Sequence, residues 1–404
     1  MPESKYEWRK ASSAQDAAAE LDFSIVRDDV SFRAQRWLHL ITGSGMSTLK
    51  RALFFAAVSW LPVAVWALST GRALHGAEHD SLAAHFGLHV RCLVAIPMMI
   101  LAEGIANKAI PEFLRGFVDT GIVTAESMRE FRARIASVAR LRDRTLPWVV
   151  IIGVVIALST ASAMLSHPES MTWGNPPNGL RDIPFGGWWF LLVIRPLFTV
   201  LVLAWLWRGC LLFVLLVKIA RMPLSLVPSH PDRVGGLGFV ERLAFVFSPV
   251  VFAISSAAAA SFAHEVIYHG VDPMSIKALL VTSAVLVSVI FLIPFAPLCV
   301  VLGKLKRDAV LQYANLVAYH DRLVHMRWIE GRDIGEPEIM DVPELGPVAD
   351  IHAVYDAVAN IRGMLVSKVA IAAVAVPAVL PMAYVFAIKM PLSDILGKIV
   401  KTVI

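Results

Sequence analysis

Long apolar stretches separated by polar loops dominate the chain. A transmembrane helix needs about 20 mostly apolar residues, and seven segments have this character: roughly 52–70, 86–106, 146–166, 188–217, 239–263, 278–303 and 369–388. The last is the weakest, because Pro377 and Pro381 make it either a kinked span or a re-entrant hairpin. The pattern predicts an all-α polytopic membrane protein with six or seven transmembrane helices and a small helical cytosolic cap.

The polar stretches divide the chain into four regions: an N-terminal region (1–51), a transmembrane core (52–303), a second polar helical region (304–368), and the last membrane segment with an amphipathic tail (369–404). Two larger loops, 107–145 and 218–242, interrupt the core. In the N-terminal region, apolar residues recur at helical spacing from Phe23 to Ile41. They predict an amphipathic helix that lies on the inner membrane surface or packs on the cytosolic cap.

Helical periodicity continues in the larger polar loops. Residues 109–118 and 124–144 predict two helices that are joined at Gly121, with Thr124 as the N-cap of the second. The apolar residues at helical spacing in the sixth segment continue to about Trp328, which predicts that this helix extends beyond the membrane. The pattern over 348–366 predicts a further amphipathic helix. We expect these helices to form one cytosolic cap together with the loop 218–242.

The distribution of basic residues orients the chain. Only 17% of the residues are charged and 57% are hydrophobic. Of the 37 Lys and Arg residues, 28 lie in four alternate regions: 1–51, 107–145, 218–242 and 304–368. The positive-inside rule therefore places the N-terminus and these loops in the cytosol. The C-terminus lies outside if the last segment spans, and on the inner surface if that segment is a hairpin. The net charge of +5 reflects this topology and does not indicate a nucleic-acid partner.

Four charged residues fall inside predicted spans, where each is costly unless it is paired or solvated. Glu103 and Arg208 lie at similar depths in the second and fourth spans and predict a buried ion pair. Arg91 and Arg195 share a depth nearer the outer surface. They could line a vestibule that attracts anions; the alternative is that they reach the interface or bond to carbonyl groups.

Histidines gather at the predicted outer ends of the spans. His75 and His79, and likewise His85 and His89, are four residues apart, and His264 and His269 end the fifth span. Imidazole groups with nearby carboxylates can bind zinc, and His89 with His264 could ligate a haem. The spacing is not that of H-E-x-x-H, and these residues could equally be polar groups at the membrane interface.

The most distinctive stretch is a turn-rich elbow between the fourth and fifth spans. It contains Ser229, His230, Pro231, Asp232, Arg233, Gly235, Gly236 and Gly238. Proline excludes a continuous helix here, and glycine permits positive φ. The glycine run could present backbone amides to a phosphate or another headgroup. Alternatively, the elbow is a packed corner at which Asp232 or Ser229 caps the next helix, or it takes part in gating.

The elbow also carries a resemblance. The run from Ser229 to Gly238 resembles an HPD-x-x-GGL segment in a group of uncharacterised bacterial multi-pass membrane proteins, and the Pro-Glu-Leu-Gly stretch at 343–346 is similar too. Together these cover roughly the second half of the chain. The resemblance implies a location in the bacterial inner membrane, but it implies no activity and no catalytic residue.

Three functions are compatible with the sequence. The first is a channel or carrier for a small anion, with Arg91 and Arg195 at its outer end. The second is a membrane-anchored sensor or scaffold whose cytosolic helices bind a protein partner. The third is a metal-dependent enzyme that uses the outer histidines. No nucleophile–base pair or P-loop favours an enzyme, and no cofactor is expected apart from that metal. The expected partners are the lipid bilayer, further copies of the chain and a cytosolic protein.

Overall fold

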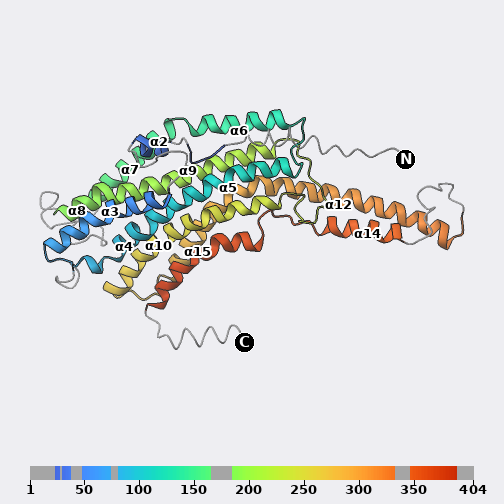
Figure 1. Ribbon diagram of the computed structural model, residues 1–404. Helices are drawn as coiled ribbons and strands as arrows, with labels where there is room; N and C mark the ends of the chain where they lie inside the picture. Colours follow the sequence, from blue (N-terminus) through green and yellow to red (C-terminus); the bar gives the residue numbers. More distant parts are fainter. Residues whose placement is uncertain are drawn as a thin grey trace.

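The computed structural model describes residues 23–27, 30–37, 48–73, 81–164, 184–332 and 346–388, and these residues form helices and turns without a strand. The helices pack into an elongated bundle, from one end of which two helices project together (Figure 1). We call the projecting pair the arm and this end of the bundle the arm side. The opposite end is called the pocket side.

Six helices of the described chain are long and apolar enough to cross a membrane. This confirms the predicted fold class, and the chain is a multi-pass integral membrane protein. Several spans combine consecutive helical elements; in chain order the six are α3 (Thr48–Ser69); α4 (Phe86–His89), η2 (Val90–Ala95) and α5 (Ile96–Asp119); α8 (Phe185–Trp189), η4 (Phe190–Ile194) and α9 (Arg195–Ala220); η5 (Gly238–Leu243) and α10 (Ala244–Tyr268); α11 (Lys277–Leu292), η6 (Ile293–Phe295) and α12 (Ala296–Val324); and α15 (Lys368–Ala387).

The predicted third segment is helix α7 (Leu146–Met164), which lies against α9. Trp148 and Ile151 of α7 pack with Ala204 of α9 in a small apolar cluster. Val149, Val150, Ile152 and Ile156 face outward from the bundle. An exposed face of this composition suits contact with lipid rather than water.

The last apolar segment is one continuous helix, α15, although it contains Pro377 and Pro381. The side chain of Ser367 accepts a hydrogen bond from the backbone of Ala370 and so caps its first turn. The helix packs along α10 and also contacts α11, so neighbouring helices support the turns that proline weakens. Of the two alternatives for this segment, the structure therefore has the span and not the hairpin; residues 389–404, with the predicted tail, lie outside the described residues.

The N-terminal segment packs on the bundle through an irregular turn and a short helix, α2 (Val30–Trp37). The hydroxyl of Ser24 accepts hydrogen bonds from the amides of Val26 and Arg27, so the chain turns where the periodicity predicts a helix. Arg142 of α6 (Met128–Arg142) donates to the carbonyl of Ser24 and stacks over Phe23. These contacts agree with packing on the protein, the second of the two alternatives for this region.

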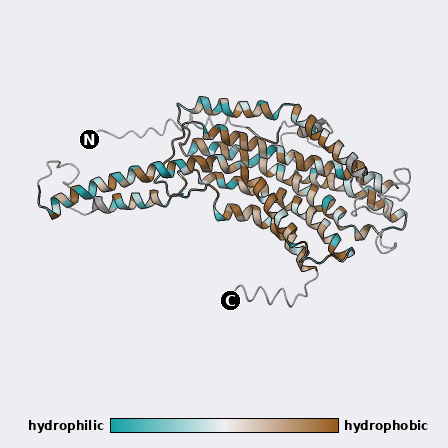
Figure 2. Cartoon of the chain, turned by 180° about the vertical axis from the view of Figure 1, so that it is seen from behind, coloured by the Kyte–Doolittle hydropathy of each residue, from teal (hydrophilic) through white to brown (hydrophobic). Residues whose placement is uncertain are grey.

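The arm consists of the projecting part of α12, the π-helical turn η7 (His325–Ile329) and α14 (Gly346–Ala359), as Figures 1 and 2 show. It is richer in hydrophilic residues than the bundle (Figure 2). Nε2 of His352 in α14 lies 3.0 Å from Oδ1 of Asp321 in α12, so the two helices of the arm contact each other. In contrast, α6 lies along the bundle (Figure 1), so the expectation of one cap that unites all these helices is wrong.

Three predicted helix boundaries are also wrong in detail. Helix α5 continues unbroken to Asp119, and α6 begins after Ser127 and not at Thr124. The predicted helix 348–366 ends at Ala359, because the backbone of Ile361 and Arg362 instead bonds to the base of the arm and to the elbow.

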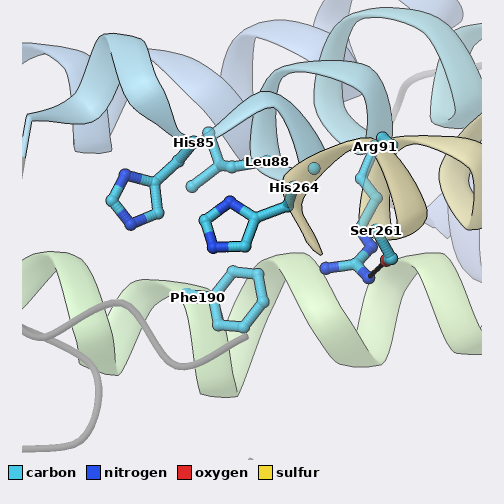
Figure 3. Close-up of a pocket in the computed structure, with 8 residues that line it drawn as sticks. His85, Leu88, Arg91, Phe190, Ser261 and His264 are labelled. Atoms are coloured by element: carbon cyan, nitrogen blue, oxygen red, sulfur yellow. Dashed lines mark hydrogen bonds between the residues drawn. The ribbon is translucent and has the colours of Figure 1, made fainter. Parts of the chain in front are cut away.

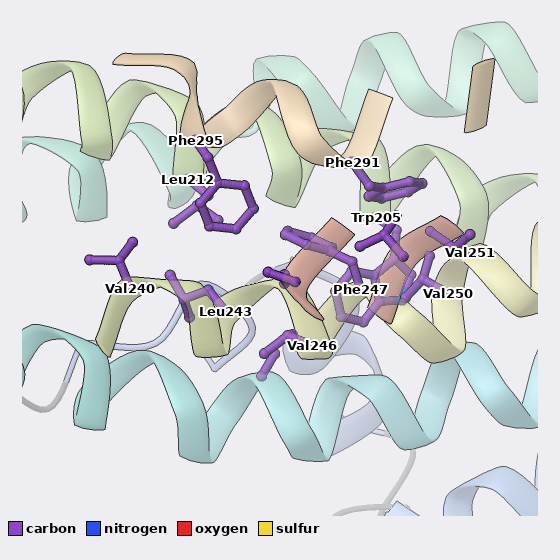
Figure 4. Packing of buried hydrophobic residues seen from close by; sticks show 14 of the residues in the cluster. Trp205, Leu212, Val240, Leu243, Val246, Phe247, Val250, Val251, Phe291 and Phe295 are labelled. Atoms are coloured by element: carbon purple, nitrogen blue, oxygen red, sulfur yellow. The ribbon is translucent and has the colours of Figure 1, made fainter. Parts of the chain in front are cut away.

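The centre of the bundle is closely packed with aromatic and aliphatic side chains from four spans. Trp205, Phe247, Phe291 and Phe295 meet there, surrounded by aliphatic residues of α9 and α10 (Figure 4). The indole of Trp205 donates a 3.1 Å hydrogen bond to the carbonyl of Met99 in α5. A buried indole N–H normally needs such a partner, and this bond fixes α9 against α5.

Gly104 permits a close approach of α3 to α5. A Cβ atom at this position would lie 2.6 Å from Cγ2 of Thr48. We expect Gly104→Ala to destabilise the protein by about 1–3 kcal/mol through overpacking, and Thr48→Ala to offset part of that loss in the double variant. Thermal unfolding in detergent measures both effects. Gly209→Ala is the control, because a Cβ atom there meets no atom within 4 Å; equal effects of the two alanines would contradict the prediction.

Candidate functional site

A small cavity on the pocket side lies between three spans. Its walls come from α4 and η2, from η4, and from the end of α10 (Figure 3). The residues that line it are His85, Gly87, Leu88, Arg91, Phe190, Ala260, Ser261 and His264. Its volume is about 30 Å³. A water molecule needs roughly 10–15 Å³ by this measure, so the cavity accommodates one or two water molecules or a small ion.

Two of the three walls are π-helical. Both η2 and η4 end directly before a proline-containing turn, with Pro97 following Ile96 and Pro196 following Arg195. Proline cannot donate the backbone hydrogen bond that would continue a regular α-helix, which favours the wider π turn before it. Single π turns occur frequently at functional sites, and here two of them adjoin the same cavity.

The lining is basic. Arg91 donates a 3.3 Å hydrogen bond to the hydroxyl of Ser261. His85 is 7% exposed, its Nδ1 lies 2.8 Å from the carbonyl of Ser81, and its ring centroid lies 6.4 Å from that of His264. Among the described lining residues there is no aspartate or glutamate. Because the guanidinium is always protonated, Arg91 brings a positive charge to the cavity.

Only some of the predicted outer residues meet at this cavity. Arg91, His85 and His264 line it, whereas Arg195 is the first residue of α9 and is not among the lining residues. His269 is exposed at the end of α10, with its ring centroid 5.7 Å from that of His264. His75 and His79 lie outside the described residues.

His89 is occupied by structural hydrogen bonds. The indole of Trp60 donates to its Nδ1 at 2.9 Å, and its Nε2 lies 2.9 Å from the carbonyl of Leu82. An indole N–H only donates and a carbonyl only accepts, so His89 is neutral with its proton on Nε2. In this arrangement both ring nitrogens already have protein partners, and the role of His89 as a zinc or haem ligand stays a prediction. Within the described part of the chain, no group of three or more metal-ligating side chains occurs.

A second charged group lies toward the arm side, where α3 begins. Arg208 Nη2 lies 2.9 Å from Glu103 Oε1, so the structure brings the two predicted ion-pair partners together. Arg51 Nη2 bonds to the other carboxylate oxygen, and all three side chains are about 1% exposed. We call Arg51, Glu103 and Arg208 the buried triad.

Two further side chains contact the buried triad. Gln35 of α2 accepts a 2.7 Å hydrogen bond from Arg51 Nε, and the ring of Trp205 lies 5.1 Å from the guanidinium carbon of Arg208. An arginine over an indole face gains a cation–π interaction. Sequence reasoning missed Arg51, because it placed the start of the first span at residue 52 and assigned Arg51 to the preceding loop.

The elbow folds around the carboxylate of Asp232. This side chain accepts hydrogen bonds from the amides of Val234 (2.9 Å), Gly236 (3.1 Å) and Gly238 (2.9 Å). Gly238 is the first residue of η5, so Asp232 satisfies the start of the fifth span as a cap does. The backbone amides that a phosphate would need are thus already bonded to the chain's own carboxylate, which contradicts the phosphate-binding interpretation.

The elbow environment lowers the pKa of Asp232 below its ordinary value of 3.8. Desolvation by burial is the largest influence and raises the pKa, but the three backbone hydrogen bonds and the contact with His230 together outweigh it. His230 Nδ1 lies 2.9 Å from the carboxylate. The ionised form of Asp232 is therefore the one that the fold stabilises.

The elbow is also bonded to the base of the arm. Arg362, which follows α14, donates its backbone amide to the carbonyl of Arg233 at 2.8 Å and its guanidinium to Glu241 at 2.7 Å. Lys306 of α12 donates to the carbonyl of Ile361. Gly235 has φ +68° and lies directly against Leu305 of α12. The base of the arm, the elbow and η5 are thus joined by hydrogen bonds.

No protein-family model matches the chain, and neither a curated protein nor a solved structure matches it.

Proposed function

We propose that the protein is a carrier for a small inorganic anion, which enters through the cavity on the pocket side. The observation that carries this proposal is the cavity itself: a guanidinium, two imidazoles and a hydroxyl line a space of ionic size. Anion pathways use cationic side chains in this way. The distribution of Lys and Arg supports an orientation in which the cavity faces outward and the arm is cytosolic, and the resemblance of the elbow supports the bacterial inner membrane.

A carrier agrees better with the packing than an open channel does. Between Arg91 and Glu103, a distance of about 18 Å along the helix, the side chains of Ile96, Met99 and Ile100 are at most 1% exposed. An ion cannot pass such a close-packed layer without a rearrangement. The π-helical turns beside the cavity are suitable places for one, because their hydrogen bonding is already irregular.

We expect Arg91→Gln to lower anion uptake at least tenfold in liposomes reconstituted with the purified chain. The substitution removes the positive charge but retains a polar side chain. Uptake is followed with chloride, bromide or nitrate under an imposed anion gradient. Arg115→Gln is the matched control, since Arg115 is exposed on the same span outside the cavity.

The variant Arg195→Gln tests whether the anion enters through the cavity alone or through the wider vestibule that the sequence suggests. Anion uptake near that of the wild type supports entry through the cavity of Arg91 alone. A loss of uptake as large as that of Arg91→Gln supports a vestibule that includes both arginines. No uptake above empty liposomes, across voltage and pH, would contradict the carrier.

A sensor or scaffold is the second candidate, and the arm favours it. Hydrogen bonds join the base of the arm to the elbow and to Glu241 at the start of the fifth span, and the other end of that span carries Ser261 and His264 of the cavity. On the arm, Leu311, Leu316 and Tyr319 are each at least 47% exposed, and exposed apolar side chains can bind a protein partner. This function predicts ligand binding without uptake, together with a cytosolic protein whose capture by the full chain is lost in Leu316→Asp.

A further inference from the structure

We propose that the junction between α6 and α7, together with α2, binds the headgroups of anionic phospholipids at the arm-side face of the membrane. We call this surface the basic corner, and it is defined by four exposed arginines: Arg33, Arg36, Arg140 and Arg144. The inference uses neither the cavity nor uptake.

The basic corner carries positive charge that the described chain does not neutralise. Two of its arginines lie on α2, one lies at the end of α6, and one directly precedes α7. Among the described residues, no ion pair involves any of the four. The carboxylate of Asp143, next to them in the sequence, pairs with Arg142 instead. Because guanidinium groups are always protonated, four positive charges are available to an external anion.

Contacts of the N-terminal segment place α2 beside this end of α6. Arg142 donates to the carbonyl of Ser24 and stacks over Phe23. Helix α2 begins at Val30, and a chain of six residues reaches at most about 21 Å. Figure 1 shows α2 next to the end of α6 that leads into α7. The four arginines thus gather at one end of α6.

The depth of the basic corner follows from the packing of α7 on α9. Trp148 of α7 packs with Ala204 of α9, and the two helices run in opposite directions (Figure 1). Arg144 lies about one helical turn before Trp148, and Arg208 of the buried triad lies about one turn after Ala204. Arg144 is therefore at about the depth of the buried triad.

Helix α2 lies at the same depth, and this depth is that of lipid headgroups. Gln35 of α2 accepts a hydrogen bond from Arg51 of the buried triad. Glu103 of the triad is the eighteenth residue of the span that begins at Phe86, about 27 Å along the helix axis. The hydrocarbon core of a bilayer is about 30 Å thick. The buried triad thus marks the arm-side edge of this core, and the basic corner lies at that edge.

An exposed apolar surface continues from the basic corner toward the pocket side. Leu146, Val149 and Val150 of α7 are 68%, 63% and 58% exposed. Such side chains suit acyl chains, while the arginines before them suit phosphodiester groups. Clusters of four or more basic residues next to a membrane segment attract anionic lipids. A soluble phosphate or a nucleic acid would use the charges but not the apolar face, so the combination favours a phospholipid.

Phosphatidylglycerol is the probe that tests the proposal. The full chain is reconstituted into vesicles of equal parts phosphatidylcholine and phosphatidylglycerol and extracted in mild detergent. Mass spectrometry then gives the ratio of phosphatidylglycerol to phosphatidylcholine that remains bound. The rise in Tm when phosphatidylglycerol is added to the delipidated chain is an independent measure of binding.

The test variant is Arg140→Gln/Arg144→Gln, and Arg140→Lys/Arg144→Lys preserves its charges. The matched control is Arg129→Gln/Arg322→Gln, which removes two exposed charges elsewhere. Arg129 lies at the far end of α6, about 16 Å along the helix from Arg140, and Arg322 lies on the arm.

If the basic corner binds anionic lipid, the test variant should lower the bound ratio at least fivefold and reduce the rise in Tm. Arg33→Gln/Arg36→Gln should do the same, because α2 supplies the other two charges. The lysine variant and the matched control should keep the wild-type values. An unchanged ratio in both glutamine variants of the basic corner would overturn the proposal. An equal rise in Tm with inorganic phosphate or a short DNA duplex, lost in the test variant, would identify a soluble anion or a nucleic acid as the ligand and would also overturn it.

Discussion

Glu103→Gln should be the most destabilising single substitution in the transmembrane bundle. It removes the carboxylate that bonds to both Arg51 and Arg208, so each buried guanidinium group loses a negatively charged partner. Breaking a buried ion pair in this way typically costs about 3–5 kcal/mol. We expect a large fall in Tm in detergent and a lower yield of folded protein.

Two comparisons test the physical reason for that loss. Glu112→Gln changes an exposed carboxylate of the same helix and should alter stability little. The double variant Glu103→Gln/Arg51→Gln should recover part of the stability, because it also removes one of the two buried positive charges that Glu103 contacts. If Glu103→Gln unfolds at the same temperature as Glu112→Gln, the triad does not stabilise the bundle.

The triad also shows how far sequence reasoning reaches in a membrane protein. Glu103 and Arg208 could be paired from sequence, because helical rise gives their depths and an unpaired charge in lipid is costly. Arg51 could not be added by the same reasoning, because it lies in the first turn of α3. At a helix end, an arginine that faces the core and one that faces water have the same sequence pattern, and only the packing of α2 and α5 around Arg51 distinguishes them.

The cavity required information that the periodicity does not contain. The depth of Arg91 was predictable, but depth gives no rotation about the helix axis, and the π-helical turns η2 and η4 alter that rotation. The motif X-Pro at residues 96–97 and 195–196 was a signal for these turns. The roles of the histidines also depend on hydrogen-bond partners that the sequence does not give. The ring of His89 bonds to Trp60 and to the carbonyl of Leu82, whereas His264 lines the cavity.

The arm differs from the predicted cap for a related reason. Amphipathic periodicity identified the helices of the arm and α6, but it cannot say which of them share a core. The structure pairs α12 with α14 and leaves α6 along the bundle (Figure 1). The early end of α14 depends on Arg362, whose bonds to Arg233 and Glu241 replace the last turns of the predicted helix.

Asp232→Ala should destabilise the elbow strongly. The amides of Val234, Gly236 and Gly238 would lose their acceptor at once, and an unsatisfied buried donor costs about 1–3 kcal/mol. Because the elbow is only partly buried, water should satisfy some of these groups, and we expect a total loss of about 2–4 kcal/mol. Thermal unfolding measures the loss, and limited proteolysis should show faster cleavage between α9 and α10. Asp308→Ala, at an exposed position on α12, is the control.

Lowering the pH should cause part of the same loss of stability in the wild type, because it protonates Asp232. The fold lowers the pKa of Asp232 below 3.8, so its contribution to stability is fully present above that value and is lost as the pH falls through the lower pKa of the folded state. Asp232→Asn keeps an oxygen that can accept but cannot ionise, so it should be less stable than the wild type at pH 6. As the pH falls below 3.8, the wild type should lose more stability than Asp232→Asn, and the difference in stability between the two proteins should narrow. Parallel pH profiles would show that the ionised carboxylate of Asp232 does not hold the elbow together.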